Sequence, residues 1–173
     1  MKTKTQKIAL TGVLAAQALA LSFLENLLPA LPFLPPGVKL GLSNIVTMFC
    51  AGSLGFTTAF CVTVIKSLFV FLTRGATAFF MSLGGGLLST LAMCLMIKFV
   101  KNKSGYVGVA VASSVCHNFG QLAVSIIITK TTAMLSYAPV LLLSAVIMGF
   151  ITGTVLKLVM PLLIKQSKHF KSL

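Results

Sequence analysis

Acidic residues are almost absent from this sequence: Glu25 is the only Asp or Glu among 173 residues, and tryptophan is missing altogether. Charged residues make up 9% of the chain, whereas a soluble globular domain carries about 25%. The hydrophobic fraction is 57%, and the mean hydropathy is +1.05. Most of the chain must therefore face lipid or other apolar segments. We expect an all-α integral membrane protein without a soluble domain.

The scarcity of acidic residues also argues against most enzyme classes. One carboxylate leaves no pair for acid–base catalysis and no cluster to hold magnesium on a diphosphate. The sequence has no phosphate-binding glycine loop, nucleophile elbow or zinc-ligand spacing. Its four cysteines lie in apolar runs without a CxxC pattern, which is typical of packing residues. We therefore expect a protein that is not an enzyme, needs no cofactor or metal, and cannot hydrolyse ATP by itself.

The 14 basic residues give a formal net charge of +13, but they do not form the basic and aromatic stripe typical of nucleic-acid binding. They cluster at the two ends of the chain and at residues 98–103, as the positive-inside rule predicts for cytoplasmic segments. Only Lys39, Arg74 and Lys130 then fall outside. This asymmetry predicts six spans with both termini in the cytoplasm. The first apolar stretch is long enough to be a retained helix rather than a signal peptide.

The apolar runs predict a single transmembrane domain over residues 1–173. The second and third runs are shorter than the roughly 20 residues of a usual span, although we expect both to cross fully. The proline-rich segment 29–39 cannot form a regular helix, so it must lie at the interface or line an enclosed cavity. The predicted spans are approximately 8–28, 40–54, 57–72, 76–100, 106–129 and 139–164.

Ionisable residues inside spans are costly and suggest function. Glu25 and Asn26 lie at the outer end of the first span, either solvated or salt-bridged at the interface or at the rim of a substrate cavity. Lys66 lies in the middle of the third span, where it could extend to the interface, pair with Glu25 or point into a wet cavity. Arg74 and Lys39 could attract an anion at the outer face or anchor the chain there.

A second polar cluster lies in the fifth span, where His117 and Gln121 share a helix face with Asn118 beside them. Such residues can line a ligand site or can bond neighbouring helices. We favour the ligand site and add Asn44 as a weaker member. The predicted substrate-binding residues are Lys39, Asn44, Arg74, His117, Asn118 and Gln121.

Small residues form a third pattern. The run Gly84–Gly86 permits either a close helix approach or a break in the fourth span. The pairs Gly149/Gly153 and Ala16/Ala20 each place two small residues four positions apart, a spacing suited to helix contact. We expect the Gly149/Gly153 pair to serve packing within the bundle.

Three segments resemble the Gx transporter family, which is also labelled heptaprenyl diphosphate synthase component I. They are LPFLPPGVKLGLSNIVT at 31–47, FMSLGGGLLS at 80–89 and HNFGQ at 117–121. This family is similar to the substrate-binding S components of energy-coupling-factor (ECF) transporters. The resemblance implies six helices and an outward-facing pocket capped by the loop after the first helix. It also implies that an alanine-rich face of the first helix, here Ala16 and Ala20, docks onto a membrane coupling subunit that works with ATPase subunits.

The predicted function is therefore uptake of a small, anionic metabolite or cofactor precursor at the cell membrane. The alternative is a non-catalytic membrane subunit associated with polyprenyl diphosphate or quinone synthesis, or with a membrane redox assembly. The synthase label fits the residues poorly, because the chain has no aspartates to bind a diphosphate.

Overall fold

The computed structural model describes residues 4–27, 41–99 and 105–172, and it describes the side chains of these ranges except for Asn26 and residues 163–172. Every element in these ranges is helical. The elements are α1 (Lys4–Leu27), α2 (Leu42–Ser53), α3 (Phe56–Arg74), α4 (Ala76–Phe99), α5 (Gly105–Thr129), the 3-10 helix η1 (Thr132–Tyr137) and α6 (Ala138–Ser172).

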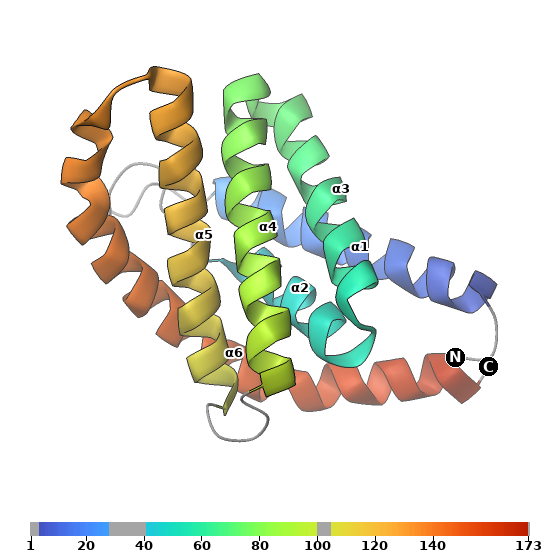
Figure 1. The fold of residues 1–173 in the computed structure, drawn as a ribbon. Helices are drawn as coiled ribbons and strands as arrows, with labels where there is room; N and C mark the ends of the chain where they lie inside the picture. Colours follow the sequence, from blue (N-terminus) through green and yellow to red (C-terminus); the bar gives the residue numbers. More distant parts are fainter. Residues whose placement is uncertain (1–3, 28–40, 100–104, 173) are drawn as a thin grey trace.

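The six predicted spans agree with the six α-helices to within about four residues at most boundaries. The last span differs most, because α6 continues through Pro161 to Ser172 instead of ending near residue 164. Proline removes one backbone hydrogen bond from a helix and favours a bend, and α6 indeed changes direction along its length (Figure 1). The connection between α5 and α6, which lies outside the predicted spans, contains η1.

Five described helices are long and apolar enough to cross a membrane, as expected of a multi-pass membrane protein. The exception is α2, which has 12 residues. At 1.5 Å per residue it extends about 18 Å, less than the roughly 30 Å of a hydrocarbon layer. Its length therefore does not support the prediction that the second span crosses fully.

The short helix α2 lies at the centre of the bundle. It packs against α1, α3, α4 and α6, and most of its side chains are buried. Helix ends within a membrane are tolerated where other protein segments surround them or where they line a cavity. The surrounding helices thus allow α2 to begin inside the protein, whereas Gly52 and Ser53 at its other end are exposed.

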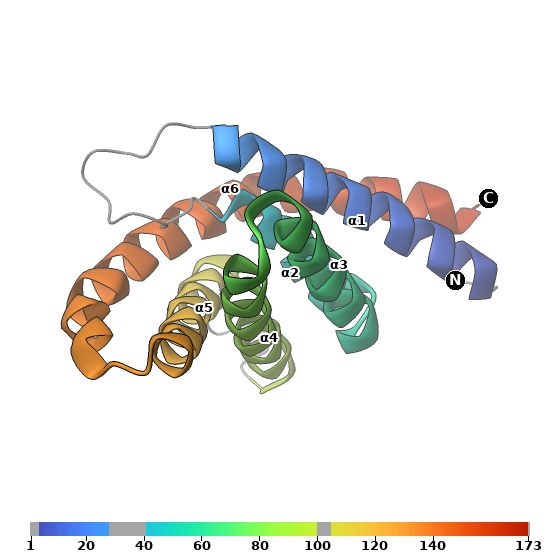
Figure 2. The same ribbon diagram turned by 90° about the horizontal axis from the view of Figure 1, so that it is seen from above.

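The helices α3, α4 and α5 lie side by side in chain order, and α6 follows α5 (Figures 1 and 2). On the other side of α3 lies α1, which crosses it obliquely (Figure 1). Because α4 runs back between α3 and α5, Arg74 and Lys130 lie at one end of the bundle and Lys98 lies at the other. The two chain ends lie on the same side of the molecule (Figure 2).

Glycines bring α4 and α5 into close contact. A methyl group at Gly120 would lie 2.7 Å from the carbonyl oxygen of Gly84 and 2.8 Å from the Cα atom of Gly85. The helix α4 remains regular through its three glycines, so they permit close approach and do not break the span. The α5–α6 contact is similar, since a methyl group at Gly153 would lie 2.6 Å from the Cα atom of Val107. The predicted packing role of the Gly149/Gly153 pair is thereby confirmed.

Buried hydroxyl groups join the same helices. The Thr63 and Thr90 hydroxyls are 2.7 Å apart between α3 and α4, and those of Ser89 and Ser113 are 2.9 Å apart between α4 and α5. Hydrogen bonds of this kind hold helices together where lipid supplies no hydrophobic driving force. These bonds help to fix α3, α4 and α5 relative to one another, and all three helices contribute side chains to the site described next.

Candidate ligand-binding cavity

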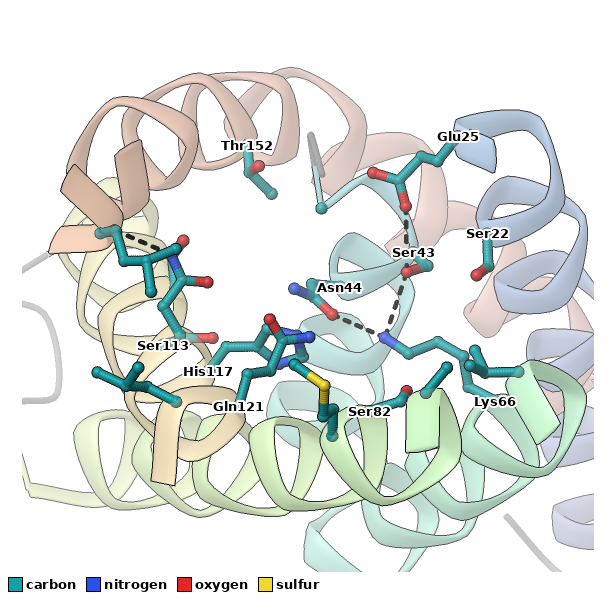
Figure 3. A pocket seen from close by; sticks show the side chains of 18 of the residues that line it. Ser22, Glu25, Ser43, Asn44, Lys66, Ser82, Ser113, His117, Gln121 and Thr152 are labelled. Carbon is teal, nitrogen blue, oxygen red and sulfur yellow. Dashed lines mark hydrogen bonds between the residues drawn. The ribbon is translucent and has the colours of Figure 1, made fainter. Parts of the chain in front are cut away.

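A cavity of about 460 Å³ lies inside the bundle. This volume falls in the range of about 300–1,000 Å³ that small-molecule sites occupy. Side chains from all six α-helices and η1 line it. Figure 3 shows polar side chains from α1, α2, α3, α5 and α6 around the same central space.

Five of the six predicted substrate-binding residues line this one cavity: Asn44, Arg74, His117, Asn118 and Gln121. Arg74 is exposed at the end of α3, and the other four are partly buried. The sixth residue, Lys39, lies outside the described residues, as does the 29–39 segment expected to close the pocket. The geometry brings the five together, and their binding role stays a prediction.

A chain of hydrogen bonds runs along the wall formed by α1, α2 and α3 (Figure 3). The Lys66 ammonium donates to Asn44 Oδ1 at 2.7 Å and to Ser43 Oγ at 3.2 Å. The Ser43 hydroxyl in turn donates to Glu25 Oε2 at 3.5 Å. Lys66 is 6% exposed and Glu25 8%, so Lys66 points into the bundle and does not extend to the interface. Of the three possibilities weighed for Lys66, the structure rules out the interface: Lys66 lines the cavity and is also linked to Glu25 through Ser43.

Glu25 also fixes the start of α2. Its Oε1 accepts a hydrogen bond from the backbone N–H of Leu42, the first residue of that helix, at 2.8 Å. A carboxylate at this position satisfies a backbone donor and offsets the positive end of the helix dipole. Glu25 therefore lies in the cavity lining, one of the possibilities that the sequence presented, and it also has a structural role at α2 that the sequence did not suggest.

The opposite wall is formed by α5 and carries uncharged amide groups and an imidazole. His117 and Gln121 point into the cavity (Figure 3). A methyl group at Gly85 would lie 2.7 Å from Gln121 Cγ and 3.2 Å from His117 Cε1. The glycine run in α4 thus leaves room for both side chains. It contributes to the site as well as to helix packing.

Asn118 takes both of the roles that the sequence left open. Its side chain lines the cavity, and its Nδ2 atom donates to the Leu141 carbonyl oxygen of α6 at 2.9 Å. The Ser144 hydroxyl donates to the same oxygen, also at 2.9 Å. Asn118 therefore holds α5 against α6 in addition to facing the cavity.

Several lining residues were not predicted as part of the site. Glu25 and Lys66 were considered for function but were not included among the predicted binding residues. The sequence draws attention to both, because Glu25 is the only acid in the chain and Lys66 is a lysine in the middle of a span. Buried hydroxyl and thioether groups carried no such signal, because serine and methionine are common in apolar helices. The lining residues without a sequence signal include Ser22, Ser43, Ser113, Met48, Met81 and Met93.

The cysteines and histidines do not form a metal site within the described ranges, where no group of three potential ligands occurs. All four cysteines are free. Cys50 is buried, as expected of a packing residue, whereas Cys61 is exposed on α3. The interpretation of the cysteines as packing residues therefore does not hold for Cys61.

These features define a multi-pass membrane protein with an internal, partly polar cavity. The family model for heptaprenyl diphosphate synthase component I matches residues 14–159, and the chain belongs to this family. The matched region contains every described residue of the cavity lining. A search of curated proteins and a search of solved structures each found no match. The resemblance to ECF S components has no counterpart in these comparisons and stays a prediction.

Proposed function

We propose that this chain is the substrate-binding membrane subunit of an ECF-type transporter and that it captures a small polar metabolite in the internal cavity. The observation that carries the proposal is the cavity itself, where the buried Glu25 and Lys66 and partly buried amide side chains converge inside an apolar helix bundle. Ionisable groups at membrane depth are expensive and typically mark substrate pathways. A bound polar molecule would offset part of the cost of burying them.

The lining suits binding and release better than chemistry. Its one carboxylate, that of Glu25, already accepts hydrogen bonds from Leu42 N and Ser43 Oγ. No second acid exists in the chain to complete an acid–base pair. We therefore propose a non-enzymatic subunit that relies on a coupling subunit and ATPase subunits to drive uptake.

One face of α1 is suited to the proposed coupling subunit. Ala16 and Ala20 are exposed, and a methyl group at nearby Gly12 would meet no atom within 4 Å. The neighbouring Ala15 and Ala18 are buried against the bundle. Small exposed residues let a partner helix approach closely, which supports Ala16 and Ala20 as docking residues.

We further propose that the protein lies in the cell membrane with both termini in the cytoplasm. The separation of Lys98 from Arg74 and Lys130 supports this orientation. In a cysteine-free background, Ser104→Cys should react only with a membrane-permeant reagent. Reaction with an impermeant reagent in intact cells would contradict the orientation.

The family description supports a second candidate function. A membrane subunit of a heptaprenyl diphosphate synthase would bind the catalytic subunit and supply no catalytic residues itself. The match over residues 14–159 favours this candidate. The small number of acids does not oppose it, provided that the partner supplies the diphosphate-binding aspartates.

Co-purification separates the two candidates. The tagged chain would be extracted from its native membrane in mild detergent, and the proteins retained with it would be quantified. Stoichiometric recovery of a membrane coupling subunit with ATPase subunits is the expected result. Recovery of a soluble prenyl diphosphate synthase without those subunits would contradict the transporter and support the second candidate.

A further inference from the structure

Resting on the proposed function, we infer that the cavity takes a compact organic monoanion, with its negative group at Lys66 and Asn44 and an apolar, ring-containing body. The inference names a substrate class and adds Lys66, Ser43 and Glu25 as residues that set the charge preference. Three observations carry it: the balance of charge, the depth of Lys66 and the side chains that surround the rest of the cavity.

The charge balance of the lining is positive. Among the described lining residues, Lys66 and Arg74 supply two positive charges, and Glu25 supplies one carboxylate. Glu25 is also bonded to the N-terminus of α2, where its charge offsets the positive end of the helix dipole. Its negative charge is therefore shared between Lys66 and the helix end. Since charges interact more strongly away from water, an anion gains most by entering this cavity.

The depth of the two cations distinguishes their roles. Lys66 is buried in the middle of α3, and its ammonium is held between Asn44 and Ser43 (Figure 3). Arg74 is exposed at the end of the same helix. A charge at the mouth of a cavity attracts anions, whereas a desolvated, fixed charge inside it discriminates between them. Lys66 is therefore the residue that recognises the negative group.

The remaining lining describes the body of the ligand. Methionine side chains from α2, α4 and η1, together with Val70 and Leu122, form apolar parts of the surface. Methionine adapts to irregular shapes and makes favourable contacts with aromatic rings. His117 and Gln121 on the α5 wall offer an imidazole and an amide as hydrogen-bonding groups. A ring with a polar edge matches this combination better than a fully polar molecule. The methionines are Met48, Met81, Met93 and Met134.

A short prenyl diphosphate shares part of this chemistry, since it joins an anionic group to an apolar body. A diphosphate, however, carries at least two negative charges, and the described lining has one positive charge in excess. A monoanion such as a carboxylate therefore matches the cavity better. The test below includes both types of compound.

The test compares indole-3-acetate with its uncharged isostere indole-3-acetamide, using ligand-observed NMR on the full chain in lipid nanodiscs. We expect the carboxylate to bind at least about tenfold more tightly, because a hydrogen bond to a charged partner is worth more than one to a neutral partner. Lys66→Met should reduce this ratio to about one, and Lys66→Arg should retain it, because only the latter keeps the positive charge. Lys98→Met removes an exposed lysine that does not line the cavity and should leave the ratio unchanged.

Equal binding of the two indoles, absence of binding by both, or a preference that survives Lys66→Met would overturn the inference. Tighter binding of dimethylallyl diphosphate than of the carboxylate would overturn the choice of a monoanion. Native mass spectrometry shows whether the inference alone is wrong or the proposed function is wrong as well. A neutral small molecule retained by the purified chain would overturn the inference and leave the proposed function standing.

Discussion

The two walls of the cavity differ in how they place polar groups inside an apolar bundle. The wall from α1, α2 and α3 contains charges that hydrogen bonds hold together, from Glu25 through Ser43 to Lys66. The α5 wall contains an imidazole and amide groups but no Lys, Arg, Asp or Glu, and glycines in α4 leave the space that His117 and Gln121 occupy. We call the wall from α1, α2 and α3 the charged wall and the α5 wall the neutral wall. The stability of the charged wall depends on the compensation of its charges, whereas that of the neutral wall depends on how closely its side chains and helices fit together. Substitutions that disturb charge and substitutions that disturb volume should affect the two walls differently.

The largest effect is expected at Glu25, on the charged wall. Glu25→Ala removes the carboxylate from the neighbourhood of Lys66 and leaves the N–H of Leu42 without its acceptor. Removing one partner of a buried ionic network costs about 3–5 kcal/mol. We therefore expect a loss of about 3 kcal/mol in the free energy of unfolding, measured by thermal or denaturant unfolding in detergent.

Glu25→Gln is the matched control, because it keeps a hydrogen-bond acceptor for Leu42 N and loses only the charge. It should destabilise the protein less than Glu25→Ala. Combining Glu25→Ala with Lys66→Met should recover part of the loss, since no uncompensated lysine then remains. Full additivity of the two single substitutions would show that Glu25 and Lys66 are not coupled.

A substitution that adds volume at the neutral wall should destabilise the protein through overpacking. The methyl group of Gly120→Ala would lie within 3 Å of the α4 backbone, which cannot move aside as a flexible side chain can. We expect destabilisation of about 2 kcal/mol, visible as a lower Tm. Gly12→Ala adds the same methyl group in open space on α1 and should be neutral or slightly stabilising. Equal Tm changes for the two variants would contradict the close α4–α5 contact.

Gln121 and Asn118 lie on the same wall but should respond differently. Losing one hydrogen bond to a ligand costs about 1–3 kcal/mol, or roughly ten- to a hundredfold in affinity. Gln121→Leu should therefore weaken uptake by this factor without reducing expression. Asn118→Leu should weaken uptake and also lose about 1 kcal/mol of stability, because the bond to Leu141 O disappears. Normal uptake by both variants would exclude them from the ligand site.

The smallest effect on folding is expected on the outer face of α1. Ala16→Trp and Ala20→Trp should leave Tm and ligand binding unchanged but prevent association with the coupling subunit, since an indole keeps the helices apart. Ala18→Trp is the control on the opposite face: Ala18 is 0% exposed, so the indole should disrupt the bundle itself. Normal assembly and transport by both outer-face variants would show that another surface docks.

The sequence predicted the helices well because each apolar run ends at a turn signal or a basic residue. It could not show that α2 is a short helix at the centre of the bundle, because an apolar run does not reveal which neighbours surround it. Three of the five predicted residues in the cavity, His117, Asn118 and Gln121, could be grouped from the sequence because their spacing places them close together on one helix. The position of Lys66 was undecidable from the sequence, since a mid-span lysine reaches either water or the interior depending on tertiary packing. The dual role of Asn118 likewise depends on where α6 lies.

The central claim is that the cavity holds a small molecule, and native mass spectrometry of the purified chain tests it most directly. The chain would be released from mild detergent under conditions that preserve noncovalent complexes, with Gln121→Leu prepared in parallel. The account predicts a discrete mass above that of the chain, of small-molecule size, which is reduced or lost in Gln121→Leu. A wild-type spectrum containing only the bare chain and lipid adducts identical to those of the variant would contradict it.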